Sequence, residues 1–171
     1  MPKPNLGLLR VLIHGANQNL TTLEKAALAS FRVREVNWSR TRAQLEDEVK
    51  LTFHDVVIIN HDTRESLKEV VELVRAEKDA ANPYAIVLYV TASPSARLIR
   101  QALGYGVDGV IGLPFAPKDM WRQLSFFINN SRTFLRTGKY FGPCRRRLQG
   151  MQFHGPERRS DSGLDHQVAA I

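Results

Sequence analysis

The sequence has little of three things: cysteine, long apolar segments and glycine-rich loops. It contains one cysteine, Cys144, which excludes an internal disulfide and favours a reducing compartment such as the cytoplasm. Its apolar runs are too short to span a bilayer, and its first 15 residues lack the apolar core and cleavage site of a signal peptide. No glycine-rich phosphate-binding loop is present. What remains, 171 residues with 43% hydrophobic and 24% charged content, is typical of one globular domain with a tail.

Positive charge is concentrated near the C-terminal end of the sequence. The net charge is +7, and the 40 residues from Arg132 onward carry +5 of it, from eight basic and three acidic residues. The preceding 131 residues carry only +2. A partner that is selected by charge is therefore expected to bind the C-terminal part of the chain.

Five short apolar segments are predicted to be β-strands. The first, third and fourth are almost continuously apolar, which is typical of strands buried on both faces of a sheet. The second alternates apolar and charged residues, and the fifth is short and contains glycine, so these two are expected at the edges. In chain order the segments are residues 8–15, 31–36, 55–60, 85–92 and 109–115.

Helical periodicity fills the intervals between and after these strands. Helices are predicted over residues 20–30, 41–52, 64–80, 95–106 and 117–136, and Leu20, Leu23, Ala27 and Leu28 are expected to form the core face of the first. Strict alternation of strand and helix predicts an α/β fold with a doubly wound, five-stranded parallel sheet in the order 2-1-3-4-5. The carboxyl ends of strands 1 and 3 are then the expected ligand site.

The most specific motifs lie in VTASPSARLIRQALGYGVDGVIGLPF, residues 90–115. They are a hydroxyl residue after the fourth strand (Thr91), the helix exit Ala-Leu-x-x-Gly-x-Asp-Gly that ends at Gly109, and Pro114-Phe115 after the fifth strand. The run RVLI before Asn17 and the run HDVVIIN add two further strand motifs. Together these segments resemble the receiver domain of bacterial two-component response regulators. The resemblance covers about residues 8–130 and implies a flavodoxin-like receiver fold.

The resemblance also implies which residues would carry receiver chemistry. In receivers two acids after the first strand hold Mg²⁺, and an aspartate at the end of the third strand accepts a phosphoryl group. A lysine after the fifth strand and a hydroxyl after the fourth steady the phosphoryl oxygens. In this sequence the acid positions correspond to Gly15 and Ala16, the acceptor to Asn60 and the lysine to Leu113, and only Thr91 is retained. We therefore expect a degenerate pseudo-receiver that binds no metal and no cofactor.

Other polar residues surround the same strand ends. His14, His61 and Asp62 could bind a metal ion or another small ligand in this crevice, or they are strand-end and loop residues without a ligand. Asp62 as a displaced phosphoacceptor is a further alternative, although no pair of metal-binding acids accompanies it.

Aromatic residues on the last predicted helix lie away from its core face. Trp121 and Phe126 are either partly buried beneath neighbouring loops or part of a surface for a partner. The resemblance favours the second interpretation, because the face of the fourth helix, fifth strand and fifth helix is the usual partner and dimer surface of receivers. The helix is expected to continue through Phe134 and Leu135 to Arg136.

A loose repeat follows that helix. Residues 141–146, FGPCRR, recur thirteen positions later as residues 154–159, HGPERR. Gly-Pro pairs favour turns or extended chain, and arginine pairs bind carboxylates or phosphates. The segment is predicted to be either a disordered tail or a docking element, and such tails look similar to ones that follow receiver-like domains in some proteobacterial proteins. As a docking element its contact residues are Tyr140, Phe141, Arg145, Arg146, Arg147, Arg158 and Arg159.

Three segments and one function are therefore expected. Residues 1–7 lead into a receiver-like domain at 8–136, and residues 137–171 form a basic tail. The expected function is that of a non-catalytic adaptor in bacterial, phosphorelay-related signal transduction, whose partners are other signalling proteins or a second copy of the chain. The alternatives are a nucleic-acid-binding regulator that uses the tail and a phosphorelay receiver with an atypical acceptor. An enzyme is not expected, because no nucleophile–base pair stands out.

Overall fold

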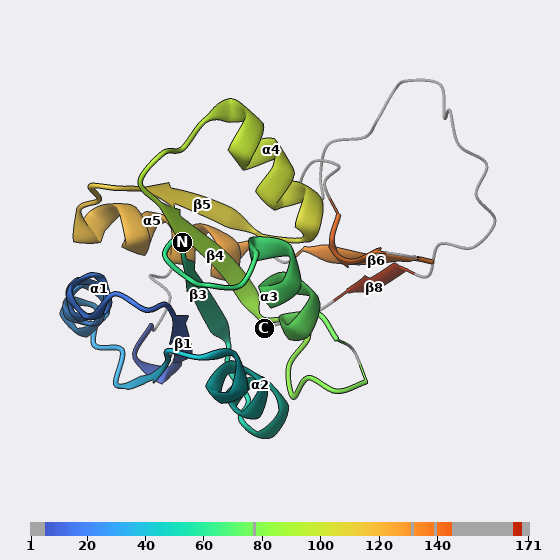
Figure 1. Cartoon of the computed structure of the whole chain (residues 1–171), viewed down its shortest axis with the longest axis horizontal. Helices are drawn as coiled ribbons and strands as arrows, with labels where there is room; N and C mark the ends of the chain where they lie inside the picture. The colour runs from blue at the N-terminus through green and yellow to red at the C-terminus, as the bar shows by residue number, and fades with distance from the viewer. Residues whose placement is uncertain (1–5, 77, 131, 139, 145–165, 169–171) are drawn as a thin grey trace.

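The computed structural model describes residues 6–76, 78–130, 132–138, 140–144 and 166–168. Its main body is a five-stranded parallel sheet in the order β2-β1-β3-β4-β5 (Figure 1), preceded by a short 3₁₀ helix, η1 (Leu6–Leu8). The strands are β1 (Arg10–His14), β2 (Glu35–Ser39), β3 (Val56–Asn60), β4 (Ile86–Thr91) and β5 (Gly109–Gly112). The predicted sheet order is confirmed, with β2 and β5 at the edges.

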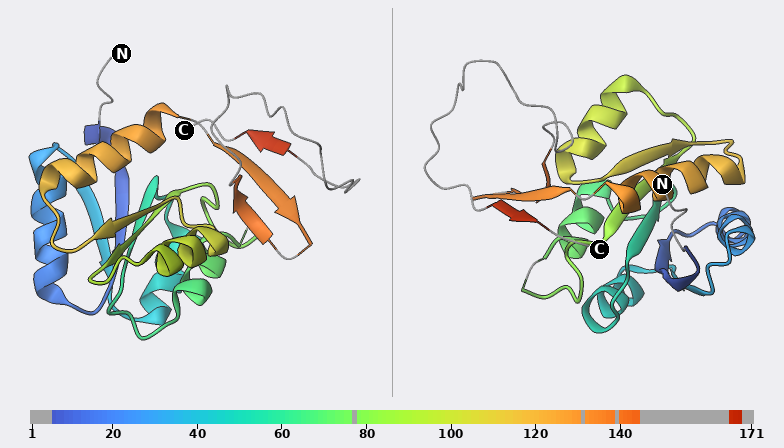
Figure 2. Two further views of the ribbon diagram at one scale, coloured as in Figure 1. Left: turned by 90° about the horizontal axis from the view of Figure 1, so that it is seen from above. Right: turned by 180° about the vertical axis from the view of Figure 1, so that it is seen from behind.

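Five helices cover the two faces of this sheet (Figure 2). One face packs against α1 (Gln18–Ser30) and α5 (Pro117–Asn129), and the other against α2 (Arg42–Leu51), α3 (Leu67–Val74) and α4 (Ala96–Tyr105). Within the described ranges, no helix combines the length and the apolar composition that a membrane crossing requires.

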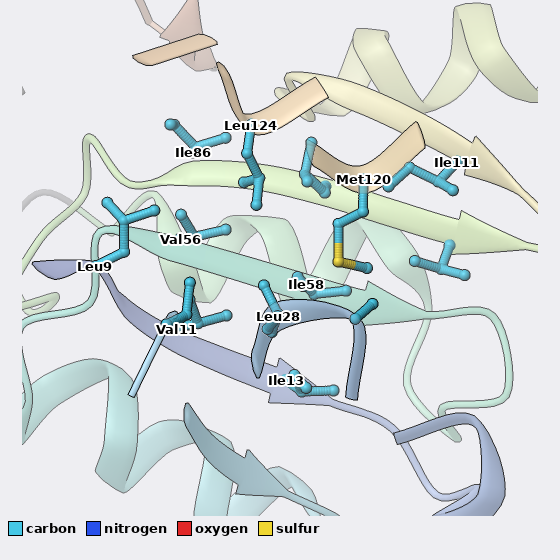
Figure 3. Packing of buried hydrophobic residues seen from close by; sticks show 14 of the residues in the cluster. Leu9, Val11, Ile13, Leu28, Val56, Ile58, Ile86, Ile111, Met120 and Leu124 are labelled. Atoms are coloured by element: carbon cyan, nitrogen blue, oxygen red, sulfur yellow. The ribbon is translucent and has the colours of Figure 1, made fainter. Parts of the chain in front are cut away.

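The apolar strands supply a core on each face because successive side chains point to opposite sides of a strand. In β1, Val11 and Ile13 belong to the core under α1 and α5, whereas Leu12 belongs to the core under the other three helices. Figure 3 shows the first core, in which Ile13 and Ile58 of the sheet lie beneath Leu28 of α1 and Met120 of α5. Strands buried in this way need continuous apolar sequence, which is the pattern that predicted them.

The second strand and the third helix differ in extent from the prediction. The second strand occupies Glu35–Ser39 rather than residues 31–36, because Phe31 caps α1 and Arg32 adopts a positive φ of 68° that turns the chain. Helix α3 covers only Leu67–Val74 of the predicted 64–80, and it ends where the side chain of Arg75 enters the protein interior.

The predicted helix over 117–136 was too long. Helix α5 ends at Asn129, and the chain continues as strand β6 (Thr133–Thr137), which pairs antiparallel with β7 (Tyr140–Pro143). The backbone of β8 (His166–Val168) pairs with the other edge of β6. Phe134 explains the change, because its side chain is 4% exposed and packs edge-on against Tyr84, with ring centroids 5.0 Å apart. The expected domain boundary at residue 136 therefore falls within a strand.

Buried charges join this hairpin to the main sheet. The guanidinium of Arg75 donates to the carbonyl oxygens of Pro83 and Ala85, both at 2.7 Å, and lies 5.0 Å from the centre of the Phe134 ring. Arg75 also pairs with Asp108 at 2.8 Å, and Arg132 reaches the other oxygen of the same carboxylate at 3.3 Å. Asp108 thus connects α3, the start of β5 and the start of the hairpin.

Candidate functional site

Three strands end in buried polar residues at the same edge of the sheet. β1 ends at His14, β3 at Asn60 and β4 at Thr91. The register places His14 beside Ile59 and Asn60 beside Val90, so the three strand ends are neighbours. This edge is the switch point of the sheet, where doubly wound folds bind their ligands.

Gly15, at the position of the first metal-binding acid of receivers, has no room for a side chain. A Cβ atom at Gly15 would lie 2.7 Å from Asn60 Nδ2 and 2.8 Å from Asn60 Cβ. Ala16 is exposed and carries only a methyl group. Neither side chain can therefore supply the carboxylate oxygens that Mg²⁺ prefers.

Asn60 is instead paired with an acid that sequence reasoning missed. Its Nδ2 donates a hydrogen bond to Oε2 of Glu24 at 3.0 Å, and both side chains are 0% exposed. Glu24 belongs to α1, on the face that also carries Leu20 and Leu28, four residues before and after it. That spacing was the available signal. Leu23, which was expected on the core face, is 47% exposed, so that assignment was wrong.

The surroundings of Glu24 favour its neutral form. The pKa of Glu24 is raised to about 7, chiefly by burial; the hydrogen bond from Asn60 lowers the pKa, and the nearby charge of Asp62 raises it. Four buried oxygen atoms of this region lack a hydrogen-bond partner: Thr21 Oγ1, Glu24 Oε1, Asn60 Oδ1 and Asp62 Oδ1. Three of these atoms are carboxyl or amide oxygens, and Thr21 Oγ1 is a hydroxyl that can donate as well as accept.

His14 is held by two residues beside this cluster. Its Nδ1 lies 3.0 Å from Ser39 Oγ, and its Nε2 lies 3.3 Å from Glu65 Oε2. Burial lowers the pKa of His14, whereas the hydrogen bond and the charge of Glu65 raise it less. The net effect favours a neutral imidazole.

The three residues that were considered as metal ligands differ in their exposure. His14 is buried, His61 is exposed and Asp62 is half-buried. In the part of the chain that the structure describes, no three histidine, cysteine or acidic side chains are grouped so that they could hold a metal ion.

The remaining two positions of the family motif lie at the ends of β4 and β5. Thr91 is buried, and its Oγ1 accepts a hydrogen bond from the amide of Ser93 at 3.3 Å. Leu113 is half-buried against the core and precedes Pro114 through a cis peptide bond. Its apolar side chain places no positive charge at the position of the receiver lysine.

Trp38 closes the site on the side of β2. Its Nε1 donates to the carbonyl oxygen of Gly15 at 2.9 Å. Two cations lie over its ring, Lys25 Nζ of α1 at 5.5 Å and Arg40 Cζ at 5.1 Å from the centre. Trp38 therefore contacts both the middle of α1 and the residue that follows β1.

The predicted surface residues have diverse environments. Trp121 is half-buried against the core of α1 and α5, and Phe126 is 39% exposed and packs edge-on against Phe127. Phe141 is half-buried in β7 against Tyr84, and the Tyr140 hydroxyl donates to the carbonyl oxygen of Pro143 at 2.9 Å. The predicted contact residues Arg145, Arg146, Arg147, Arg158 and Arg159 lie outside the described residues.

The similarity of this chain to known proteins is found among solved structures. No family model and no curated protein sequence matches the chain. Among solved structures, it is similar to the receiver domain of sensor histidine kinase PA1611 from Pseudomonas aeruginosa PAO1, which was solved with a magnesium ion in its active-site cleft. That match has a TM-score of 0.61 at 18% identity and covers 71% of this chain and 98% of that one.

Two further similar structures are also receivers. The chemotaxis response regulator CheY4 of Vibrio cholerae matches with a TM-score of 0.60 at 18% identity, over 68% of this chain and 95% of that chain. The beryllofluoride-activated NtrC4 receiver domain dimer matches with a TM-score of 0.56 at 18% identity, over 67% of this chain and 89% of that chain. The chain thus has the receiver fold of response regulators, in agreement with the resemblance drawn from its sequence.

Proposed function

We propose that this chain is a non-catalytic pseudo-receiver, which acts as a protein-interaction module in phosphorelay-related signal transduction in the bacterial cytoplasm. The observation that carries the proposal is the contact between Gly15 and Asn60. Asn60 occupies the acceptor position, and its side chain fills the space that a metal-binding acid at residue 15 would need. The acceptor is lost because residue 60 is an amide, and the first metal ligand is lost because the same side chain leaves no room for one at residue 15.

The electrostatics of the site argue in the same direction. An amide oxygen is a much weaker nucleophile than a carboxylate, and Leu113 cannot neutralise the charge of a transferring phosphoryl group. Glu65 and Asp62 lie at the same edge of the sheet, where their charges act on His14. A negatively charged phosphoryl donor would meet acidic groups here without a metal ion between them.

Contact with other proteins is the activity that we expect of a receiver fold that transfers no phosphoryl group. The α4–β5–α5 surface, which in receivers is the usual partner and dimer surface, carries half-buried or exposed apolar side chains here, among them Val110, Phe115 and Phe126. We propose this surface for signalling partners or for a second copy of the chain.

Phosphotransfer is tested directly by intact mass spectrometry of the purified chain after incubation with acetyl phosphate and Mg²⁺. A phosphorylatable receiver treated in parallel is the positive control. We expect no added phosphoryl mass, and no change in tryptophan fluorescence with beryllofluoride and Mg²⁺. A stoichiometric adduct would refute the proposal and direct attention to Asp62 as the acceptor.

Nucleic-acid binding is the second candidate, and the net charge of +5 after residue 131 favours it. Residues 1–144 retain the β6–β7 hairpin, so a chain shortened after Cys144 removes the later arginines without cutting a strand of that pair. Binding of RNA or DNA that falls steeply with salt in the full chain, and is lost in the shortened one, would support this candidate over the adaptor.

A further inference from the structure

Glu24 is a fully buried carboxyl group with few hydrogen-bond partners. It is 0% exposed, and among the described residues its carboxyl group accepts one hydrogen bond, from the Asn60 amide. Its second oxygen, Oε1, is buried without a partner, as are the nearby Asn60 Oδ1 and Thr21 Oγ1. A buried carboxylate normally needs several donors or a cation, because burial without compensation strongly disfavours the charged form.

The charged groups around Glu24 do not supply that compensation. Asp62, from the loop after β3, acts on Glu24 with the same sign of charge. His14 of β1 has Ser39 and Glu65 as its close partners, and the charge of Asp62 also acts on it. Lys25, the next residue of α1, has its ammonium group over the Trp38 ring. The α5 side chains that join this core are the apolar Met120 and Leu124.

A proton on Glu24 would resolve this conflict. It removes the buried charge and the repulsion from Asp62, and it converts one unpartnered acceptor into a donor among otherwise unpartnered oxygen atoms. The Asn60 amide can still donate to Oε2 of the neutral acid.

We propose that a proton on Glu24 holds α1 against the end of β3, and that loss of this proton loosens α1 from the sheet. In this chain a proton-dependent contact would then occupy the position at which receivers bind metal and phosphate. The proposal rests on the proposed function in one respect, namely that Asn60 takes no phosphoryl group.

The proton is observed directly by ¹³C NMR of the glutamate carboxyl groups between pH 4 and 9, with Glu24→Gln to assign the resonance. We expect the Glu24 carboxyl to titrate with a midpoint about 7, as its environment implies. Asp62→Asn should move the midpoint downward, because it removes a like charge. Glu72→Gln, on the exposed face of α3, should leave the Glu24 titration unchanged.

The loosening of α1 is measured by amide hydrogen exchange of residues 20–28. After correction for intrinsic rates, exchange in the wild type should be about tenfold faster at pH 8 than at pH 6, if the opened helix has an ordinary glutamate pKa. Glu24→Gln should remove this difference. A Trp121→Phe background makes Trp38, which contacts Lys25 of α1, the sole tryptophan and a fluorescence reporter of the same transition.

Three results would overturn the proposal. The first is a Glu24 midpoint near the ordinary glutamate pKa of 4.5. The second is exchange of α1 that does not change between pH 6 and pH 8. The third is a midpoint that shifts when Mg²⁺ or K⁺ is added, which would assign the site to a cation. If Glu24→Gln does not fold, the shift of the Glu24 midpoint in Asp62→Asn tests the proposal independently. A phosphoryl adduct would refute the proposed function, whereas an ordinary Glu24 titration without an adduct would refute only the proton-dependent contact.

Discussion

Replacing Asp108 by asparagine removes the negative charge that two arginines share. Asp108 Oδ2 accepts from Arg75 at 2.8 Å and from the amide of Val87 at 2.9 Å, while Oδ1 faces Arg132 at 3.3 Å. An asparagine side chain has nearly the same shape, so the change tests charge rather than packing. The guanidinium of Arg75 would stay protonated and buried.

The expected cost follows from the burial of the pair. Removing one partner of a buried ion pair costs about 3–5 kcal/mol, because the other charge is left uncompensated. Arg75 keeps its hydrogen bonds to the carbonyl oxygens of Pro83, Ala85 and Gly106, which places the expected loss at the lower end, about 3 kcal/mol. For a domain of this size that corresponds to a fall in Tm of about 10 °C.

Urea unfolding followed by circular dichroism at pH 7 measures this loss. Asp47→Asn, on the exposed face of α2, is the matched control and should change the free energy of unfolding by less than about 0.5 kcal/mol. Amide exchange should also show that Asp108→Asn loosens the β6–β7 hairpin before the central strands. A loss below about 1 kcal/mol would refute the reasoning, since it would mean that the carbonyl groups alone satisfy Arg75.

Three further changes probe the site. Asn60→Asp should yield no phosphoryl adduct by intact mass, and an adduct would show that the lost metal ligands are dispensable. The same variant should lower stability more at pH 8 than at pH 6, because it brings a second carboxylate to 3.0 Å from Glu24. Gly15→Ala should cost about 1–3 kcal/mol in urea unfolding, whereas Gly138→Ala, where nothing lies within 4 Å, should be nearly neutral; equal effects would contradict the crowding at Gly15. The pKa of His14 is lowered from 6.5, so the unfolded chain binds a proton there that the folded chain rejects, and stability falls as the pH drops below about 6.5. His14→Gln should flatten that acid limb, and an unchanged slope would argue against a buried neutral imidazole.

The sheet was predictable from sequence because its information is local. Continuous apolar runs mark strands that are covered on both faces, and the helices between them carry their own capping residues. Asn17 accepts from the amide of Leu20, Ser66 and Glu69 form a capping box, and Gly106 ends α4 with a φ of 111° that glycine adopts without strain.

What was missed depends on contacts between distant residues. Residues 133–143 form a hairpin because the ring of Tyr84 packs edge-on against Phe134 and Phe141. Tyr84 lies about fifty positions earlier in the chain. Glu24 was passed over because an acid on a helix is usually solvated, and only the end of β3 shows what it faces. The proposal that receiver chemistry is lost rests on residue types that the sequence already shows, whereas the crowding between Gly15 and Asn60 required coordinates.

The hairpin determines how a mechanical load would pass through this molecule. Its second strand lies against the turn between α4 and β5, where a Cβ on Gly142 would sit 3.3 Å from the Cα of Gly106. The amide of Cys144 donates to the carbonyl oxygen of Thr133 at 2.7 Å, so the strand is fastened up to that residue. We therefore expect a pull on the chain beyond Cys144 to load first the β6–β7 pair and then, through Arg132 and Gly106, the edge of the sheet that carries Asp108, opposite Asn60.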